Sequence, residues 1–346
     1  MDMNIVEYLN QLNFTALFLV FIISKLLIET YLKIRNISSI NENKETIPER
    51  FINVVTEEEY KKSINYNIER IRFSILTSVF GVGVLLFFTI GGMLNNLTVF
   101  VQGVTSSNVI GAIFLGLLLI VIGEIIEIPL AVYSTFHIEE KYGFNKTTTK
   151  TFVTDLFKNL LIQSIFSSML YAIVISIIEN LGNNWWIYAF IAVFLLQVII
   201  FYIYPVLILP LFNKFEPLED ERFKKPIERL LKKIEFKAKG LFVMDGSLRS
   251  SHGNAFFTGF GNNKRIVFYD TLLETITPDE MESILGHELG HYKLGHIKKT
   301  LISSIFFGFA GFYILGQVFQ SENFFYGHGL DELTIYSKFL LFYLVI

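Results

Sequence analysis

Two histidines and a glutamate stand at a spacing that could perform hydrolytic chemistry. His287 and His291 are four residues apart, and Glu288 directly follows the first of them. On a helix, residues i and i+4 share one face, so the two imidazoles can bind one tetrahedral Zn²⁺ ion per chain. Glu288 falls on the neighbouring flank, where its carboxylate can act as general base on a metal-bound water. The pattern predicts a zinc-dependent hydrolase of peptide bonds.

Chance is a poor explanation of this motif. With 6 His and 32 Asp or Glu among 346 residues, random placement gives such a pentad on the order of 0.01 times per chain or less. A capped helix also contains it. Thr277 is a suitable N-cap residue, Pro278 suits the first helical position, and Glu280 stands where it completes a capping box.

A third zinc ligand is harder to find. His296 lies five residues after His291, about 140° further round if the helix continues, so we expect it outside the first coordination sphere. Leu294 stands where the extended H-E-x-x-H-x-x-G-x-x-H pattern requires glycine. The chain ends at Ile346 inside an apolar run. We interpret this end as a truncation, with the third ligand expected beyond it.

Residues 212–300 form the one stretch that could fold as a soluble subdomain. A helix-like segment at 218–234 precedes strand-like runs at 241–244, 254–257 and 265–269, and the capped helix follows. The pattern predicts a small α+β, zincin-like catalytic subdomain.

The remainder of the chain has the composition of a membrane protein. Hydrophobic residues make up 52% and charged residues 18%, with a mean hydropathy of +0.49. A span needs roughly 20 mostly apolar residues. Seven runs qualify, at about 14–33, 73–93, 109–132, 156–179, 185–211, 301–319 and from 336 onward. The predicted organisation is a membrane domain over 1–211 with five spans, the subdomain at 212–300, and the last spans at 301–346.

Charge decides the orientation and excludes some partners. The segments 1–13, 94–108, 180–184 and 320–335 contain no Lys or Arg, whereas the intervening loops are rich in them. The positive-inside rule therefore predicts a cytoplasmic catalytic subdomain. A net charge of −3 argues against nucleic acid as a partner. Within the first predicted span, Lys25 and Glu29 stand at i and i+4 and are expected to pair.

Three longer stretches resemble a known family. They are residues 133–145 (YSTFHIEEKYGFN), residues 209–218 (LPLFNKFEPL) and residues 246–296, which include the motif. From about residue 70 onward the chain is similar to the Ste24-type CAAX prenyl proteases, the M48 zinc metallopeptidases. The resemblance implies an all-α polytopic protein with seven transmembrane helices around a water-filled chamber. It also implies removal of the C-terminal tripeptide from prenylated CaaX proteins.

Residue by residue, the resemblance makes His287 and His291 zinc ligands and Glu288 the catalytic base. Asn254, Ala255 and Phe256 look like the family's substrate-facing strand, although an ordinary core strand is the alternative. The family's third ligand is a Glu in an E-x-x-x-D motif after the last span, and this chain has no match to it. Prenylated or hydrophobic peptides and membrane lipid are the expected partners.

Two other functions fit part of the pattern. An HtpX-like membrane quality-control protease shares the motif, but there the motif follows two spans and not five. A catalytically inactive membrane binding protein would explain the missing third ligand, but it would have no need of Glu288.

Overall fold

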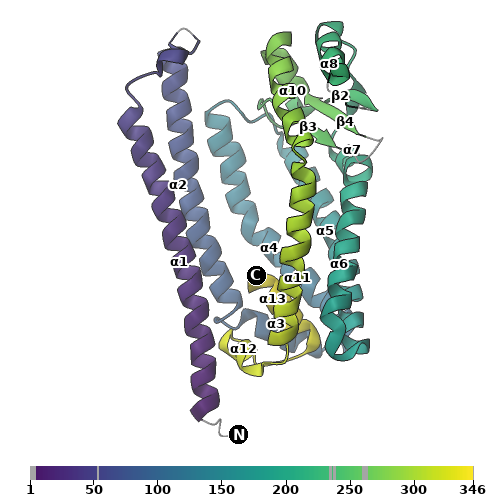
Figure 1. Cartoon of the computed structure of the whole chain (residues 1–346). Coiled ribbons are helices and arrows are strands. Elements are labelled where there is room, and N and C mark those ends of the chain that lie inside the picture. The colour runs from purple at the N-terminus through teal and green to yellow at the C-terminus, as the bar shows by residue number, and fades with distance from the viewer. Residues whose placement is uncertain (1–4, 53, 234–235, 237–238, 259–263, 346) are drawn as a thin grey trace. The chain divides into compact units, whose positions relative to one another are not determined.

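Helices dominate the computed structural model, which describes residues 5–52, 54–233, 236, 239–258 and 264–345 (Figure 1). The helices are α1 (Ile5–Asn43), α2 (Glu57–Phe88), α3 (Met93–Gln102), α4 (Asn108–Tyr133), α5 (Thr149–Asn180), α6 (Trp185–Ile203), α7 (Leu209–Phe212), α8 (Glu221–Lys233), α9 (Asp270–Thr275), α10 (Pro278–Lys293), α11 (His296–Val318), α12 (Glu322–Gly327) and α13 (Ile335–Val345). The strands are β1 (Phe215–Pro217), β2 (Gly240–Met244), β3 (Ala255–Thr258) and β4 (Arg265–Tyr269).

Among the described residues, six helical segments are long and apolar enough to cross a bilayer. They are Asn10–Asn43, Glu57–Phe88, Asn108–Glu139, Thr149–Asn180, Gly182–Phe212 and Lys298–Val318. Each overlaps one of the first six predicted spans, which are therefore confirmed as spans, although the prediction at 73–93 extends five residues beyond Phe88 and that at 301–319 one residue beyond Val318. The seventh predicted span, from 336 onward, corresponds to α13, an apolar helix of 11 residues. The segment predicted as a loop at 94–108 is largely helix α3.

The chain is divided into two compact units. The first contains Met1–Tyr142, Ile162–Trp186 and Tyr313–Ile346, and the second contains Gly143–Leu161 and Ile187–Phe312. The boundaries cut through α5, α6 and α11, so they do not coincide with the predicted divisions at 211 and 300. Contacts within a membrane helix and between neighbouring helices, rather than composition, define these units.

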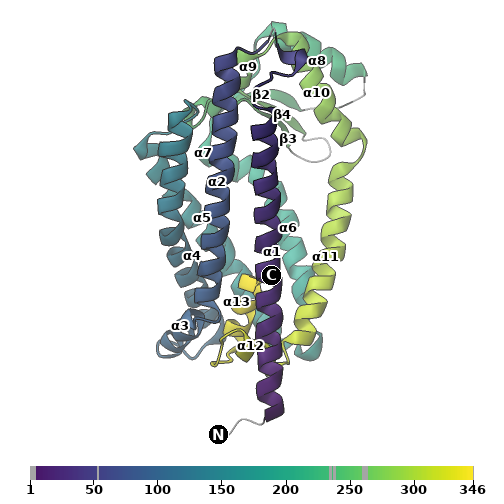
Figure 2. The ribbon, with the colours of Figure 1, turned by 90° about the vertical axis from the view of Figure 1, so that its left-hand side faces the viewer.

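Close helix packing holds the first unit together. Helix α1 runs beside α2 and contacts α12 (Figure 2). Helices α4 and α5 approach closely because the Tyr171 ring occupies the space that a Cβ atom at Gly116 would need. The side chain of Thr15 donates a 2.6 Å hydrogen bond to the carbonyl of Gly327, which ties α1 to α12. Such small-residue contacts are a common means of joining helices in a bilayer, where burial of apolar surface adds little.

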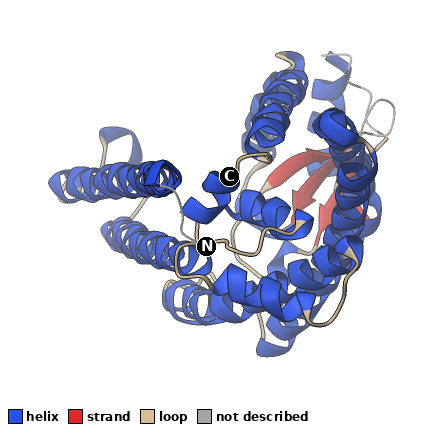
Figure 3. Cartoon of the chain, turned by 90° about the horizontal axis from the view of Figure 1, so that it is seen from below, coloured by secondary structure: helices blue, strands red, loops and turns tan. Residues whose placement is uncertain are grey.

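The strands of the second unit form one small mixed sheet of order β1-β2-β4-β3 (Figure 3). Strands β2 and β4 are parallel, with Gly240 opposite Arg265, whereas β1 and β3 pair antiparallel with their neighbours. Strands β2, β3 and β4 match the three predicted strand runs to within one residue at either end. The three-residue strand β1 was missed because it is too short to show an alternating pattern.

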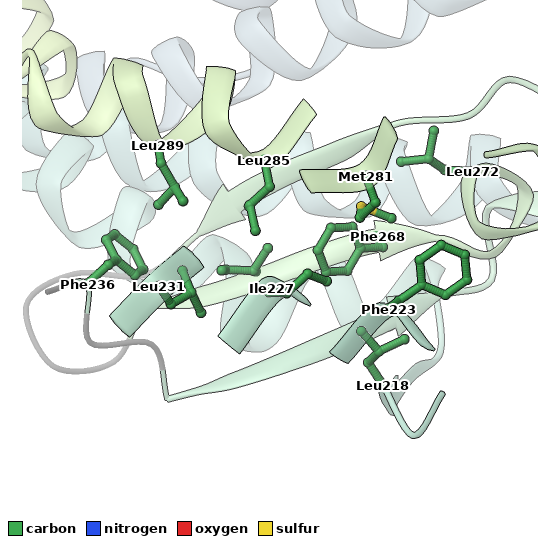
Figure 4. Close-up of a cluster of buried hydrophobic side chains, with 11 residues drawn as sticks. Leu218, Phe223, Ile227, Leu231, Phe236, Phe268, Leu272, Met281, Leu285 and Leu289 are labelled. Carbon is green, nitrogen blue, oxygen red and sulfur yellow. The ribbon is translucent and has the colours of Figure 1, made fainter. Parts of the chain in front are cut away.

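A buried cluster joins this sheet to α8, α9 and α10. Met281, Leu285 and Leu289 stand at i, i+4 and i+8 on α10, and all three are at most 3% exposed. They point toward side chains that include Ile227 and Phe268, from α8 and β4 (Figure 4). This apolar stripe fixes the rotation of α10 about its axis and so decides which residues its opposite face presents.

Shortening one member of the stripe tests its importance. Leu285→Ala removes a side chain that is 1% exposed, and we expect a loss of about 2–5 kcal/mol of stability because a cavity remains. Thermal unfolding of the detergent-solubilised protein, followed by limited proteolysis within 212–300, measures the effect. Ser283→Ala on the exposed side of α10 is the control, and an equal loss in both variants would contradict the role given to the stripe.

Candidate active site

Helix α10 starts at a complete capping box. The backbone N–H of Thr277 donates to the Glu280 carboxylate at 2.7 Å, and the Glu280 N–H donates to the Thr277 hydroxyl at 3.4 Å. Pro278 occupies the first helical position, where its missing N–H costs nothing. The sequence prediction for this helix start is therefore confirmed, and it sets the helical register of the motif nine residues later.

The two motif histidines converge through one nitrogen each. Their Nε2 atoms lie 3.1 Å apart, and both side chains are exposed on α10. A single ion at the usual Zn–N distance of about 2.0–2.1 Å from each nitrogen spans such a separation. Both imidazole rings lie on the side of α10 opposite the Leu285 and Leu289 stripe, since they stand about 120–160° round the helix from it. The donor atoms therefore fit a shared metal ion.

His296 contacts His291 because the helix breaks between them. Helix α10 ends at Lys293, and Gly295 has a φ of +67° before α11 begins at His296. Glycine adopts this left-handed conformation without steric cost. The Nδ1 atoms of His291 and His296 consequently lie 2.7 Å apart. The premise of one continuous helix is wrong, but His296 still meets the far nitrogen of His291 and not the Nε2 pair.

The Nδ1 contact can set the tautomer of His291. When the Nδ1–H of His291 donates to His296, the Nε2 of His291 keeps its lone pair for a metal ion. A sequence signal for this contact was present in Gly295, which is the residue type that commonly ends a helix in the left-handed conformation. From the sequence, Gly295 could therefore have predicted that the helix ends between His291 and His296.

Glu288 is half-buried on α10, between the histidine face and the apolar stripe. It follows His287 by about 100° of helical rotation, which places its carboxylate beside the pair of Nε2 atoms and not opposite to them. Among the residues that the structure describes, no cluster of three or more His, Asp or Glu side chains is arranged to hold a metal ion. Here the site consists of two converging nitrogens and a neighbouring carboxylate.

The predicted substrate-facing residues lie at an edge of the sheet. Ala255 and Phe256 belong to β3 and pair with Phe268 and Val267 of β4. In the sheet order β3 is an end strand, and it contacts α10. Asn254 precedes the strand, where its carbonyl accepts a hydrogen bond from Tyr269 N–H at 2.9 Å. An edge strand beside the motif helix can receive an extended peptide.

Arg249 ties the loop before β3 to two other segments of the second unit. Its Nε and Nη2 atoms donate to the Asp155 carboxylate at 2.7 and 3.0 Å, and Nη2 also donates to the Phe212 carbonyl at 2.8 Å. The Arg249 carbonyl accepts from the Thr147 hydroxyl at 3.0 Å. Sequence reasoning missed this clamp because Asp155 lies 94 residues away along the chain.

The other histidines lie elsewhere and have local partners. His252 stacks on Phe144 at 4.3 Å in the second unit, and His137 stacks on Tyr133 at 4.7 Å in the first. His328 follows α12 and is 3% exposed, and burial lowers its pKa.

Comparisons with known proteins identify the family of this chain. Residues 36–214 match the family model described as CAAX prenyl protease N-terminal, five membrane helices, and residues 217–345 match Peptidase family M48. The chain belongs to the M48 peptidase family. It is an integral multi-pass membrane metalloprotease, a homologue of the CAAX prenyl proteases.

Individual relatives extend along most of the chain. CAAX prenyl protease 1 homolog of Arabidopsis thaliana is 34% identical over 93% of this chain and 77% of its own length. CAAX prenyl protease 1 of Saccharomyces cerevisiae is 33% identical over 91% and 72%. The crystal structure of S. mikatae Ste24p superimposes with a TM-score of 0.87 and 30% identity, covering 96% of this chain and 81% of that one. The predicted fold class and family are confirmed.

Membership of the M48 family implies a metal cofactor, and the donor set of this peptidase suits one. The family model with five membrane helices also contradicts the two-span arrangement expected of an HtpX-like protease, because it ends at residue 214, before the motif.

Acid should weaken the capping box of this M48 peptidase. Hydrogen bonds from the Thr277 N–H and hydroxyl hold the pKa of Glu280 below its ordinary value. A lowered folded-state pKa adds stability above the ordinary Glu pKa, and this stability is lost as pH falls through the folded-state value. We expect Glu280→Ala to lower the melting temperature at pH 7, and the gap to wild type to close in acid. Glu282→Ala is the control. A difference in melting temperature between wild type and Glu280→Ala that does not change with pH would show that the charge of Glu280 does not stabilise the helix.

Removing His296, the partner of His291 Nδ1, should weaken metal binding although both Nε2 donor atoms remain. We expect His296→Ala to lower metal affinity about 10- to 100-fold, the usual effect of losing a hydrogen-bond partner of a metal-binding His. Competition with a chromogenic chelator measures this affinity. His252→Ala, a histidine of the same unit stacked on Phe144, is the control. Unchanged affinity in His296→Ala would show that the 2.7 Å contact does not orient His291.

Proposed function

We propose that this protein is a zinc metalloendopeptidase that removes the C-terminal tripeptide of prenylated CaaX proteins or peptides. The observation that carries the proposal is the 3.1 Å approach of the His287 and His291 Nε2 atoms on a helix that also carries Glu288. Edge strand β3 beside that helix supports a peptide substrate, and the names of the relatives supply the prenylated class.

His287 and His291 would hold one Zn²⁺ ion through their Nε2 atoms, with His296 orienting His291 from the other side of its ring. When bound there, the ion would supply Lewis-acid chemistry, which lowers the pKa of a water molecule and polarises a carbonyl. Glu288 would accept the proton of the attacking water and pass it to the departing amine. The position of Glu288 on α10 suits this role, because helical geometry places it about 100° from His287 and about 60° from His291.

Strand β3 would bind the substrate backbone. A peptide that extends the sheet at its β3 edge would pair with Asn254, Ala255 and Phe256 through main-chain hydrogen bonds, and side-chain pockets would add selectivity. The core-strand alternative accounts for the side chains of Ala255 and Phe257, which pack against the buried cluster, but not for the exposed Asn254. In this scheme the scissile bond lies along an edge that adjoins α10.

Loop charge supports the cytoplasmic side for the catalytic subdomain. The loops assigned to that side carry the Lys and Arg residues, and those assigned to the other carry none. Membrane lipid would surround the six spans, and the net charge of −3 gives no basis for a nucleic-acid partner. A cytoplasmic site fits substrates that are prenylated in that compartment.

A catalytically inactive binding protein is the second candidate. It is favoured by one observation, which is that no third metal-binding side chain joins the histidine pair among the described residues. A scaffold has no use for a base beside the donor nitrogens, so Glu288 favours the peptidase. Turnover of a defined substrate separates the two functions.

Cleavage of a farnesylated CaaX peptide by the purified, zinc-loaded protein tests the proposal. Glu288→Gln should reduce the rate by about 10²- to 10⁴-fold, the usual contribution of a general base, and leave the zinc content unchanged. Glu282→Gln, on the same helix and outside the motif, should cleave at the wild-type rate.

Either of two results would overturn the proposal. Equal cleavage by Glu288→Gln would remove the assigned base. Stoichiometric zinc without any cleavage of the peptide would favour the binding protein.

A further inference from the structure

Residues 249–252, which lead into strand β3, are held against residues 144–147 of the same unit. Ser250 and Asn145 form an isolated antiparallel bridge. On either side of it, the Lys146 N–H donates to the Arg249 carbonyl at 3.1 Å, and the Ser251 N–H donates to the Phe144 carbonyl at 3.0 Å. The chain is therefore paired backbone to backbone immediately before the edge strand.

The side chain of Arg249 joins this segment to the ends of two membrane helices. Its fork of N–H groups pairs with the Asp155 carboxylate of α5, and Nη2 also donates to the Phe212 carbonyl at 2.8 Å. Phe212 ends the helical segment Gly182–Phe212, and the last carbonyls of a helix have no partner within it. The Arg249 and Asp155 side chains are only 26% and 19% exposed. A two-pronged pair of this kind fixes orientation as well as distance.

The chain between Arg249 and β3 has further anchors. The carbonyl of His252 accepts a hydrogen bond from the Thr271 hydroxyl at 3.0 Å, and the carbonyl of Asn254 accepts one from the Tyr269 N–H at 2.9 Å. Little slack is left in which a displacement of Arg249 could be absorbed before the edge strand begins. The place of the ion pair therefore influences the place of Asn254.

We propose that Arg249 and Asp155 are positioning residues of the peptidase, whose ion pair holds the start of β3 where a bound peptide presents its scissile bond to α10. This inference rests on the proposed function. Strand β3 contacts α10, so a shift of the strand moves the peptide relative to Glu288 and the histidine pair. Neither Arg249 nor Asp155 touches the substrate in this scheme, because both act through the backbone of residues 249–254.

A positioning role and a purely structural role have different kinetic consequences. A misplacement of about 1 Å can cost on the order of 10²-fold in rate, even when the mutated residue is remote from the chemistry. The edge strand can still bind the peptide backbone, so the loss falls on kcat and not on KM. A structural ion pair would instead change the amount of folded, zinc-loaded protein and leave its kcat per bound zinc unchanged.

Steady-state cleavage of a farnesylated CaaX peptide, normalised to bound zinc, tests the inference. Arg249→Lys keeps the charge but loses the planar fork, and we expect kcat to fall about 10- to 100-fold with KM within about threefold of wild type. Asp155→Asn should behave alike. The double variant should be no slower than either single variant, because both remove the same contact.

Arg222→Lys is the matched control. Arg222 belongs to the same unit and pairs with Asp220 at 2.7 Å, but its side chain is 77% exposed and neither residue adjoins β3 in sequence. The same exchange of arginine for lysine should therefore leave kcat and KM at their wild-type values.

Hydrogen exchange separates this inference from the peptidase function. In the Glu288→Gln protein, saturating farnesylated peptide should protect backbone amides within 254–258, because the peptide extends the sheet there. Adding Arg249→Lys should weaken this protection and speed exchange within 250–252 without peptide, whereas adding Arg222→Lys should do neither. Mass spectrometry of proteolytic fragments measures the exchange.

Three results would overturn the inference and leave the peptidase proposal standing. They are wild-type kcat in Arg249→Lys, multiplication of the two single losses in the double variant, and unchanged exchange within 250–258 in Arg249→Lys. Weakened protection in Arg249→Lys, together with no cleavage by the wild-type protein, would instead contradict the peptidase proposal alone.

Discussion

The rotational setting of α10 is the constraint on which the site depends. Met281, Leu285 and Leu289 are drawn into the cluster with α8 and β4, and helical geometry then turns His287 and His291 to the opposite side. The two histidine side chains are thus positioned by apolar residues on the opposite face of the helix. Burial of the apolar stripe stabilises the orientation of α10 in which these histidines are exposed.

A second set of constraints comes from the bilayer. Backbone groups that cross hydrocarbon must be satisfied internally, which makes helices the available form for the spans. The irregular backbone needed for an edge strand and a broken helix is found in the 212–300 region, with β3 and the turn at Gly295. Composition therefore separates the membrane-spanning segments from the 212–300 region. Contacts between residues, however, place that region and parts of the spans in the same compact unit.

Much of this protein was predictable from local patterns. The six long spans follow from apolar length, and the start of α10 follows from Thr277, Pro278 and Glu280, which act within one turn. Strands β2, β3 and β4 follow from short apolar runs between turn residues. Each of these signals is carried by neighbours in the sequence, so no distant contact is needed to read it.

Tertiary contacts decided the remainder. The salt bridge of Arg249 with Asp155 joins residues 94 positions apart, and the burial of His328 depends on Phe18 of α1, so no local pattern could reveal either. The contact between His296 and His291 was not predicted, because one glycine with a positive φ changes the path of the chain between them. The sequence by itself determined the family, the spans and the motif, since these depend on composition and short spacing. The partners of the motif residues and the anchoring of the segment before β3 were decided by packing between segments that are distant along the chain.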